Sequence, residues 1–147
     1  MTADAELPED GPDDGTAEAG PAGDWMLELF VEGLESHPDS SMDITLYVGG
    51  IVVSGRLVSG ATWFEQAAVR IRSISTGDGV EGMASAFDEA AAQLRAESSV
   101  AGSDFVHVIG AQVLAPGAAS ELPSGFWRGQ LSRVDAWSVG RMSRTPS

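Results

Sequence analysis

The stretch MDITLYVGGIVVSGRLVS, residues 42–59, decides the fold. Apolar and polar side chains alternate along its first half, a period that is typical of a strand with one buried face. Gly49-Gly50 then supplies a two-residue turn. Pairing across this turn matches Val48 with Ile51, Leu46 with Val53 and Ile44 with Gly55. The stretch therefore predicts an antiparallel β-hairpin, with Gly55 at a bend or a close approach of two backbones.

A helix is predicted upstream of this hairpin, over Trp25–Ser36. Asp24 is a good N-cap residue, and His37-Pro38 stops the helix because the residue before proline is pushed out of the α region. The apolar positions recur at helical spacing; they are Leu27, Phe30, Val31 and Leu34. We expect this helix to lie on a sheet.

Two further helices are predicted after the hairpin, as an inserted helical hairpin at about residues 61–97. Thr62 and Glu65 have the spacing of a capping box, and Asp78 and Glu81 have it again before a helix that runs to about Ala96. The expected core positions are Phe64, Ala67, Ala68 and Ile71 in the first helix and Met83, Phe87, Ala90, Ala91 and Leu94 in the second.

The last third of the chain reads as three strands, over 105–115, 126–133 and 136–142, with a loop at 116–125. In the first of these, apolar residues lie on both sides of the expected strand, so both of its faces are predicted to be covered. One side should hold Phe105, His107, Ile109, Ala111 and Val113, and the other Val106, Val108 and Leu114. The apolar parity slips near Val134-Asp135, which indicates a tight turn or a bulge there.

Charge and composition divide the chain into one domain and two tails. The net charge is −14, and residues 1–24 hold eight acidic and no basic residues. Residues 1–23 have too little apolar surface to offset the entropy of ordering, which predicts a disordered acidic tail before a single domain at 24–142. Residues 143–147 form a short tail. This acidic balance argues against a protein that binds the phosphate backbone of nucleic acid.

The sequence offers no recognisable catalytic, cofactor or metal motif. Cysteine and lysine are absent, which removes thiolate ligands, disulfides and Schiff-base chemistry. The two histidines lie in unrelated contexts, and no phosphate-binding loop or nucleophile elbow occurs. We therefore predict a non-enzymatic protein without cofactor, metal or small-molecule substrate. An enzyme would need a deep pocket that holds His107 and carboxylates.

An aromatic and arginine-rich segment near the C-terminus is the candidate partner-binding site. These side chains are the types that are enriched at interface hot spots. The candidates are Trp127, Arg128, Arg133, Trp137 and Arg141. Two interpretations remain open: the tryptophans bind a partner, or they close the core while the arginines are solvated or paired with acids.

The order of these features resembles the Sm-like fold. The helix, the motif ITLYVGGIVVSGRL at Ile44–Leu57 and the late WRGQL at Trp127–Leu131 carry the likeness. It implies an α+β fold: a small five-stranded Sm-like or SH3-like antiparallel half-open β-barrel with an N-terminal helix and the helical hairpin as an insertion. The RNA-binding signature expected after the second strand is replaced by GATWF at 60–64.

A closer resemblance is to the gas vesicle accessory protein U family (GvpU-like). Three separate blocks match in order and spacing; they are Asp43–Ser59 followed by WFE at 63–65, FVHV at 105–108, and FWRGQLSRVDAWSVGR at Phe126–Arg141. The likeness spans about residues 25–142. The chain departs from the family pattern in its long acidic N-terminal tail and its short C-terminal tail.

This resemblance implies an accessory protein of gas vesicles, the gas-filled protein shells that give cells buoyancy. Its expected partners are gas vesicle shell protein or other gas vesicle proteins, with a possible homo-oligomer and without nucleic acid or membrane. Its expected location is the cytoplasm, in association with gas vesicles. The alternative is an Sm-like oligomeric RNA-binding module.

Overall fold

A computed structural model of the chain describes residues 24–97, 103–117 and 122–142. In chain order the elements are α2 (Trp25–Ser36), β1 (Ser41–Val48), β2 (Ile51–Val58), α3 (Gly60–Ile74), α4 (Asp78–Ala96), β3 (Phe105–Leu114), β4 (Leu122–Gln130), the 3-10 helix η2 (Leu131–Arg133) and β5 (Ala136–Val139). The predicted tails, 1–23 and 143–147, lie outside the described residues.

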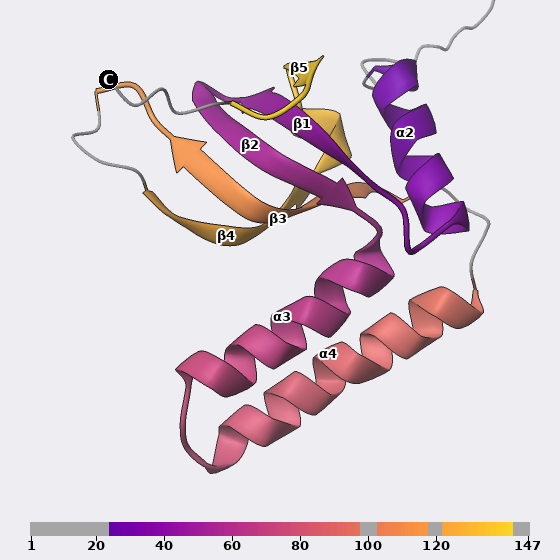
Figure 1. The fold of residues 1–147 in the computed structure, drawn as a ribbon, viewed down its shortest axis with the longest axis vertical. Helices are drawn as coiled ribbons and strands as arrows, with labels where there is room; N and C mark the ends of the chain where they lie inside the picture. The colour runs from indigo at the N-terminus through magenta and orange to yellow at the C-terminus, as the bar shows by residue number, and fades with distance from the viewer. Residues whose placement is uncertain (1–23, 98–102, 118–121, 143–147) are drawn as a thin grey trace, which may run out of the picture.

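The strands form one antiparallel sheet of order β4-β3-β2-β1-β5, with α2 on one face and the α3–α4 hairpin on the other (Figure 1). The predicted α+β class and the five strands are therefore confirmed. The sheet is not closed, because β4 and β5 lie at its two opposite edges. The expected Sm-like or SH3-like barrel is not confirmed.

The β1–β2 hairpin has the predicted register. Val48 pairs with Ile51, Leu46 with Val53 and Ile44 with Gly55. Gly49 and Gly50 both have positive φ, at 55° and 89°, which is the requirement of the type I′ turn that best suits a twisted hairpin. Ile44, Leu46 and Val53 are fully buried, so the alternation predicted the buried face correctly.

Helix α2 has the predicted bounds and covers that face. The Asp24 carboxylate accepts a hydrogen bond from the N–H of Met26 at 2.9 Å, which confirms the N-cap. Leu27, Val31 and Leu34 are buried against the sheet. The α2-side core consists of these three residues together with Ile44, Leu46, Val53, Leu57, Val106, Val108, Ala111, Val113 and Leu131.

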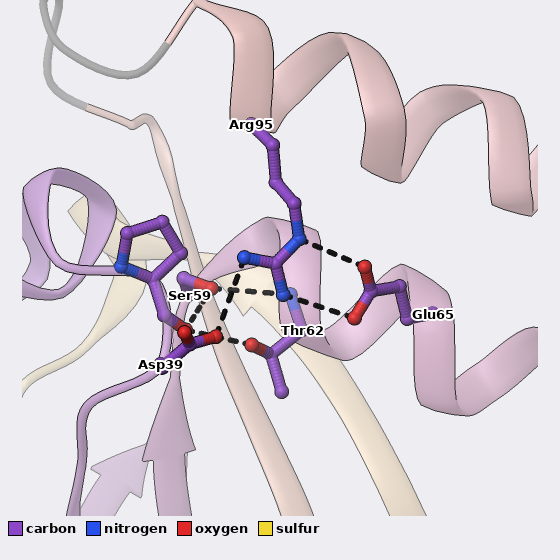
Figure 2. A network of polar contacts seen from close by, with 6 residues as sticks. Asp39, Ser59, Thr62, Glu65 and Arg95 are labelled. Carbon is purple, nitrogen blue, oxygen red and sulfur yellow. Dashed lines mark hydrogen bonds and ion pairs between the residues drawn. The ribbon is translucent and has the colours of Figure 1, made fainter.

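The predicted cap of the next helix is wrong. Helix α3 begins at Gly60, and the hydroxyl of Ser59 accepts the N–H of Thr62 at 3.1 Å (Figure 2). The Thr62 hydroxyl instead donates to the carbonyl of Pro38 at 2.7 Å. Glu65 does not reach back to the backbone, because it is paired with Arg95 of α4. The N-terminus of α3 is therefore fixed by tertiary contacts.

Helix α4 has the predicted extent, and two of its expected core positions are confirmed, since Ala91 is buried and Phe87 packs against a core cluster. Gly77 stands at its N-cap without a side-chain hydrogen bond, and Glu81 pairs with Arg72 of α3, so this capping box is also wrong. Met83 is 60% exposed, whereas Ala84 is buried. Ala84 and Ala91 are the buried residues of α4.

The α3-side cluster lies where this helical hairpin meets the sheet. Val58, Trp63 and Ala67 are its buried members. The rings of Phe64, Phe87 and Phe126 and the side chain of Ile109 pack against them. Both faces of β3 are thus covered, as predicted. Trp63, which the helical spacing did not place in the core, is 9% exposed.

The predicted division of β3 between its two faces is wrong beyond Ile109. The β2–β3 and β3–β4 registers both shift there, and Gly110 has φ 58°. This bulge moves Ala111 and Val113 to the α2-side core, beside Val106 and Val108. His107 and Ile109 face α3 instead.

The C-terminal strands β4 and β5 also differ from the predicted strands in their position and length. β4 begins at Leu122, inside the expected loop, and η2 makes the turn before β5. β5 ends at Val139 because Gly140, at φ 102°, turns the chain away. The Thr45 hydroxyl donates to the Gly140 carbonyl at 2.8 Å, and the N–H of Met142 donates to the Ser54 hydroxyl at 2.7 Å. Residues 140–142 therefore cross over β1 and β2.

Gly55 offers the sharpest test of this packing. A Cβ atom there would lie 2.7 Å from Val108 Cγ1 and 2.8 Å from the Ile109 carbonyl oxygen. Gly55→Ala should lower the free energy of unfolding by about 1–3 kcal/mol, since backbone must move. The matched change Gly82→Ala in α4, where a Cβ meets nothing within 4 Å, should raise it by about 0.5–1 kcal/mol. Urea unfolding followed by circular dichroism measures both; equal effects would contradict the close approach.

Candidate partner-binding surface

The sheet separates the five predicted site residues. Trp127 and Arg128 lie on β4 at one edge, whereas Trp137 lies on β5 at the other edge and Arg141 follows it. Arg133 ends η2, in the connection between these two strands. The segment that looks continuous in sequence therefore does not form one continuous cluster.

Both tryptophans are half-buried and pack against the α2-side core. Trp127 pairs with Val108, and its ring lies over Gly129, where a Cβ would clash with it. Trp137 meets Phe30 edge-on at 5.2 Å, and its indole N–H donates to Asp24 at 2.9 Å. That hydrogen bond, with the N–H of Met26, lowers the pKa of Asp24. Each tryptophan thus contributes to the core.

Arg128 lies on the other face of the sheet, among aromatic rings. Its Nε–H donates to His107 Nε2 at 3.0 Å. Its guanidinium lies 3.8 Å from the centre of the Phe105 ring and 5.5 Å from that of Phe64. These cation–π contacts hold the side chain in place and leave the residue exposed at the β4 edge.

His107 is held neutral by this environment. Burial, followed by the charge of Arg128, lowers its pKa to about 4. Because Nε2 accepts a hydrogen bond, the proton must be on Nδ1. His107 Nδ1 and the nearby indole Nε1 of Trp63 are buried and have no partner among the described residues. A positive charge on His107 would face both this desolvation and the Arg128 guanidinium.

The remaining two arginines differ in their pairing. Arg141 lies 3.4 Å from Asp43, which also pairs with Arg56 at 3.5 Å. Arg133 is exposed and has no ion pair within the described part of the chain. Of the predicted set, Arg133 carries its charge most freely.

A hollow of about 550 Å³ that sequence reasoning missed lies beside η2. Its lining residues are Glu28, Glu32, Ser103, Asp104, Phe105, Gln130, Leu131 and Ser132. Among the described residues that line it, three are acidic and none is basic. The signal in the sequence was Glu28 and Glu32, one turn apart on the polar face of α2.

The hollow does not bring His107 together with its carboxylates, as a catalytic interpretation would need. His107 does not line it, since α3 covers that side chain on the other face of the sheet. Among residues 24–97, 103–117 and 122–142, no group of three potential ligands could hold a metal ion. No helix in these ranges is both long and apolar enough to span a membrane.

Comparison with known protein families matches residues 24–142 to the family described as gas vesicle protein GvpU-like. The match runs from the N-cap of α2 to the last described residue after β5. No curated protein and no solved structure matches the chain.

The buried neutral His107 predicts a pH-dependent stability. Its pKa is lowered in the folded state, so its contribution is present above pH 6.5 and is lost as the pH falls toward about 4. Between pH 6.5 and 5 the free energy of unfolding should fall by about 2 kcal/mol. Urea unfolding over this range measures the loss.

His107→Gln should remove most of that pH dependence, whereas His37→Gln should preserve it, because His37 is exposed at the end of α2. The carboxylates with lowered pKa titrate below this range, and Glu35, whose pKa is raised by burial, is present in every variant, so its contribution cancels when the variants are compared with the wild type. An unchanged slope in the His107 variant would disprove the assignment.

Proposed function

Because the chain belongs to the gas vesicle protein GvpU-like family, we propose that it binds gas vesicle shell protein, associates with itself, or both, and thereby influences vesicle assembly or clustering. It is a gas vesicle accessory protein by family, and the match over residues 24–142 is the observation that carries the proposal. We further propose that it works without catalysis, in the cytoplasm, in association with gas vesicles.

The proposed contact residues are Trp127, Arg128, Arg133, Trp137 and Arg141. Arg133, which is exposed and has no ion pair among the described residues, and the exposed Arg128 support the arginine part of this set, since arginine is favoured at interface hot spots. The packing of Trp127 and Trp137 on the core makes their role one of supporting that surface.

The outer edge of β4 supports self-association or strand addition. The N–H of Leu131 donates to the carbonyl of Asp104, on the β3 side. Because this direction alternates along a strand, the backbone groups of Phe126, Arg128 and Gln130 point away from β3. Such an edge can pair with an added strand.

Flotation with purified gas vesicles tests shell binding. The wild-type chain should rise with the buoyant vesicles, and Arg133→Glu should reduce the bound fraction about tenfold at subsaturating protein, as loss of a hot-spot arginine would. Arg70→Glu is the matched control, because Arg70 is an exposed arginine of α3 with no ion pair among the described residues. Wild-type protein that stays in the subnatant would refute the proposal.

Removal of residues 1–23 should leave the domain folded and increase its self-association. The segment is acidic and adds to the repulsion between chains of the same charge. Circular dichroism checks folding, and light scattering at low and high salt measures the oligomer. An oligomer size that the deletion leaves unchanged at low salt would count against this role.

A further inference from the structure

The outer side of α2 carries two large apolar side chains that the described fold leaves uncovered. Trp25 is 69% exposed and Leu29 is 51% exposed. They are four residues apart, so they lie one above the other on consecutive turns. Leu27 and Val31 occupy the buried stripe on the other side of the helix. Tryptophan is enriched in protein interfaces, which makes this exposed pair a candidate contact.

Acidic side chains border this pair. Glu28 and Glu32 alternate with Trp25 and Leu29 along α2, and they line the hollow of about 550 Å³ together with Asp104. None of the three carboxylates has an ion pair in the described part of the chain.

Three acids of the helical hairpin contrast with these carboxylates. Glu65, Glu81 and Asp88 are each paired with an arginine of the helical hairpin. The hollow also has apolar walls, from Phe105 and Leu131.

The negative charge of the hollow indicates which kind of segment can bind to this surface. Residues 1–23 of this chain are acidic and contain no base, so the carboxylates of the hollow would repel them. An arginine or lysine fits instead, because its aliphatic stem can lie on Phe105 and Leu131 while its charged end reaches the carboxylates. A large apolar residue next to that cation would meet Trp25 or Leu29.

We propose that the α2 surface, formed by Trp25, Glu28, Leu29 and Glu32, docks a basic segment of a partner protein in which arginine or lysine alternates with large apolar residues. The inference rests on the exposed apolar pair and on charge complementarity with the hollow. It stands independently of the vesicle role, since it concerns a peptide-binding surface on the other side of α2 from the core.

Fluorescence anisotropy with labelled peptides tests the proposal on the full chain. The probe RLRGRLRGRLRG should bind, and raising the salt concentration should weaken it. The probe RGRGRGRGRGRG, which keeps the cations and lacks the apolar residues, should bind about tenfold more weakly. The probe ELEGELEGELEG should not bind.

Two double variants separate the contributions of the surface. Trp25→Ala with Leu29→Ala should weaken binding of RLRGRLRGRLRG about tenfold. Glu28→Gln with Glu32→Gln should weaken it about fivefold or more and reduce its salt dependence. All four positions face solvent or the hollow, so circular dichroism should show a folded protein.

Matched controls test whether binding depends only on the total charge of the chain or on any exposed apolar residue. Asp13→Asn with Asp14→Asn removes the same charge from the N-terminal segment, and Val69→Ala with Met83→Ala truncates exposed apolar residues on the helical hairpin. Both should change the affinity by less than about twofold.

Three results would overturn the proposal. The first is a loss of peptide affinity in the Asp13→Asn, Asp14→Asn variant that equals the loss in the Glu28→Gln, Glu32→Gln variant. The second is equal affinity for the two arginine probes. The third is a wild-type dimer in sedimentation that the Trp25 and Leu29 variant dissociates, which would make a second copy of the chain the occupant. Vesicle flotation is a separate measurement, so an absence of shell binding in that experiment would not contradict this inference.

Discussion

Gly60 is the point at which the two layers of this protein are joined. Its N–H donates to the half-buried carboxylate of Glu35 at 2.8 Å, linking the end of α2 to the start of α3. A Cβ there would lie 3.2 Å from side-chain atoms of both His107 and Leu94, so a larger residue would require these side chains to shift by a few tenths of an ångström. Burial raises the pKa of Glu35, and the hydrogen bond from Gly60 opposes that shift.

The contacts around this joint fix the helical hairpin relative to the sheet. Arg95 of α4 binds Glu65 through two nitrogen atoms, at 2.8 and 3.0 Å, and reaches Asp39 before β1 at 3.3 Å (Figure 2). In Figure 1 the hairpin extends away from the sheet beyond this region. The exposure of Ile74 and Met83, at 63% and 60%, agrees with coverage that ends partway along the hairpin.

Local pattern predicted the parts of the fold in which local interactions decide the structure. The β1–β2 register follows from alternation and Gly49-Gly50, and α2 follows from its spacing and its cap. Prediction failed where a distant residue competes for a local group. Thr62 has the sequence of a cap, yet its hydroxyl binds Pro38, and the bulge at Gly110 reverses the faces of Ala111 and Val113.

The arrangement of the candidate site also depends on contacts between residues that are distant in sequence, so local pattern did not predict it. Trp127 and Trp137 are ten residues apart in sequence, but the strand order places them at opposite edges of the sheet, and each packs on the common core. Pairing also distinguishes arginines that look equivalent in sequence, since Arg141 shares Asp43 while Arg133 has no described partner. Arg133 directly follows Ser132, which lines the acidic hollow beside α2. The proposed recognition at this end of the molecule rests on Arg133 and on the acids of the hollow, so salt should affect binding more strongly than truncation of a tryptophan that the core already holds.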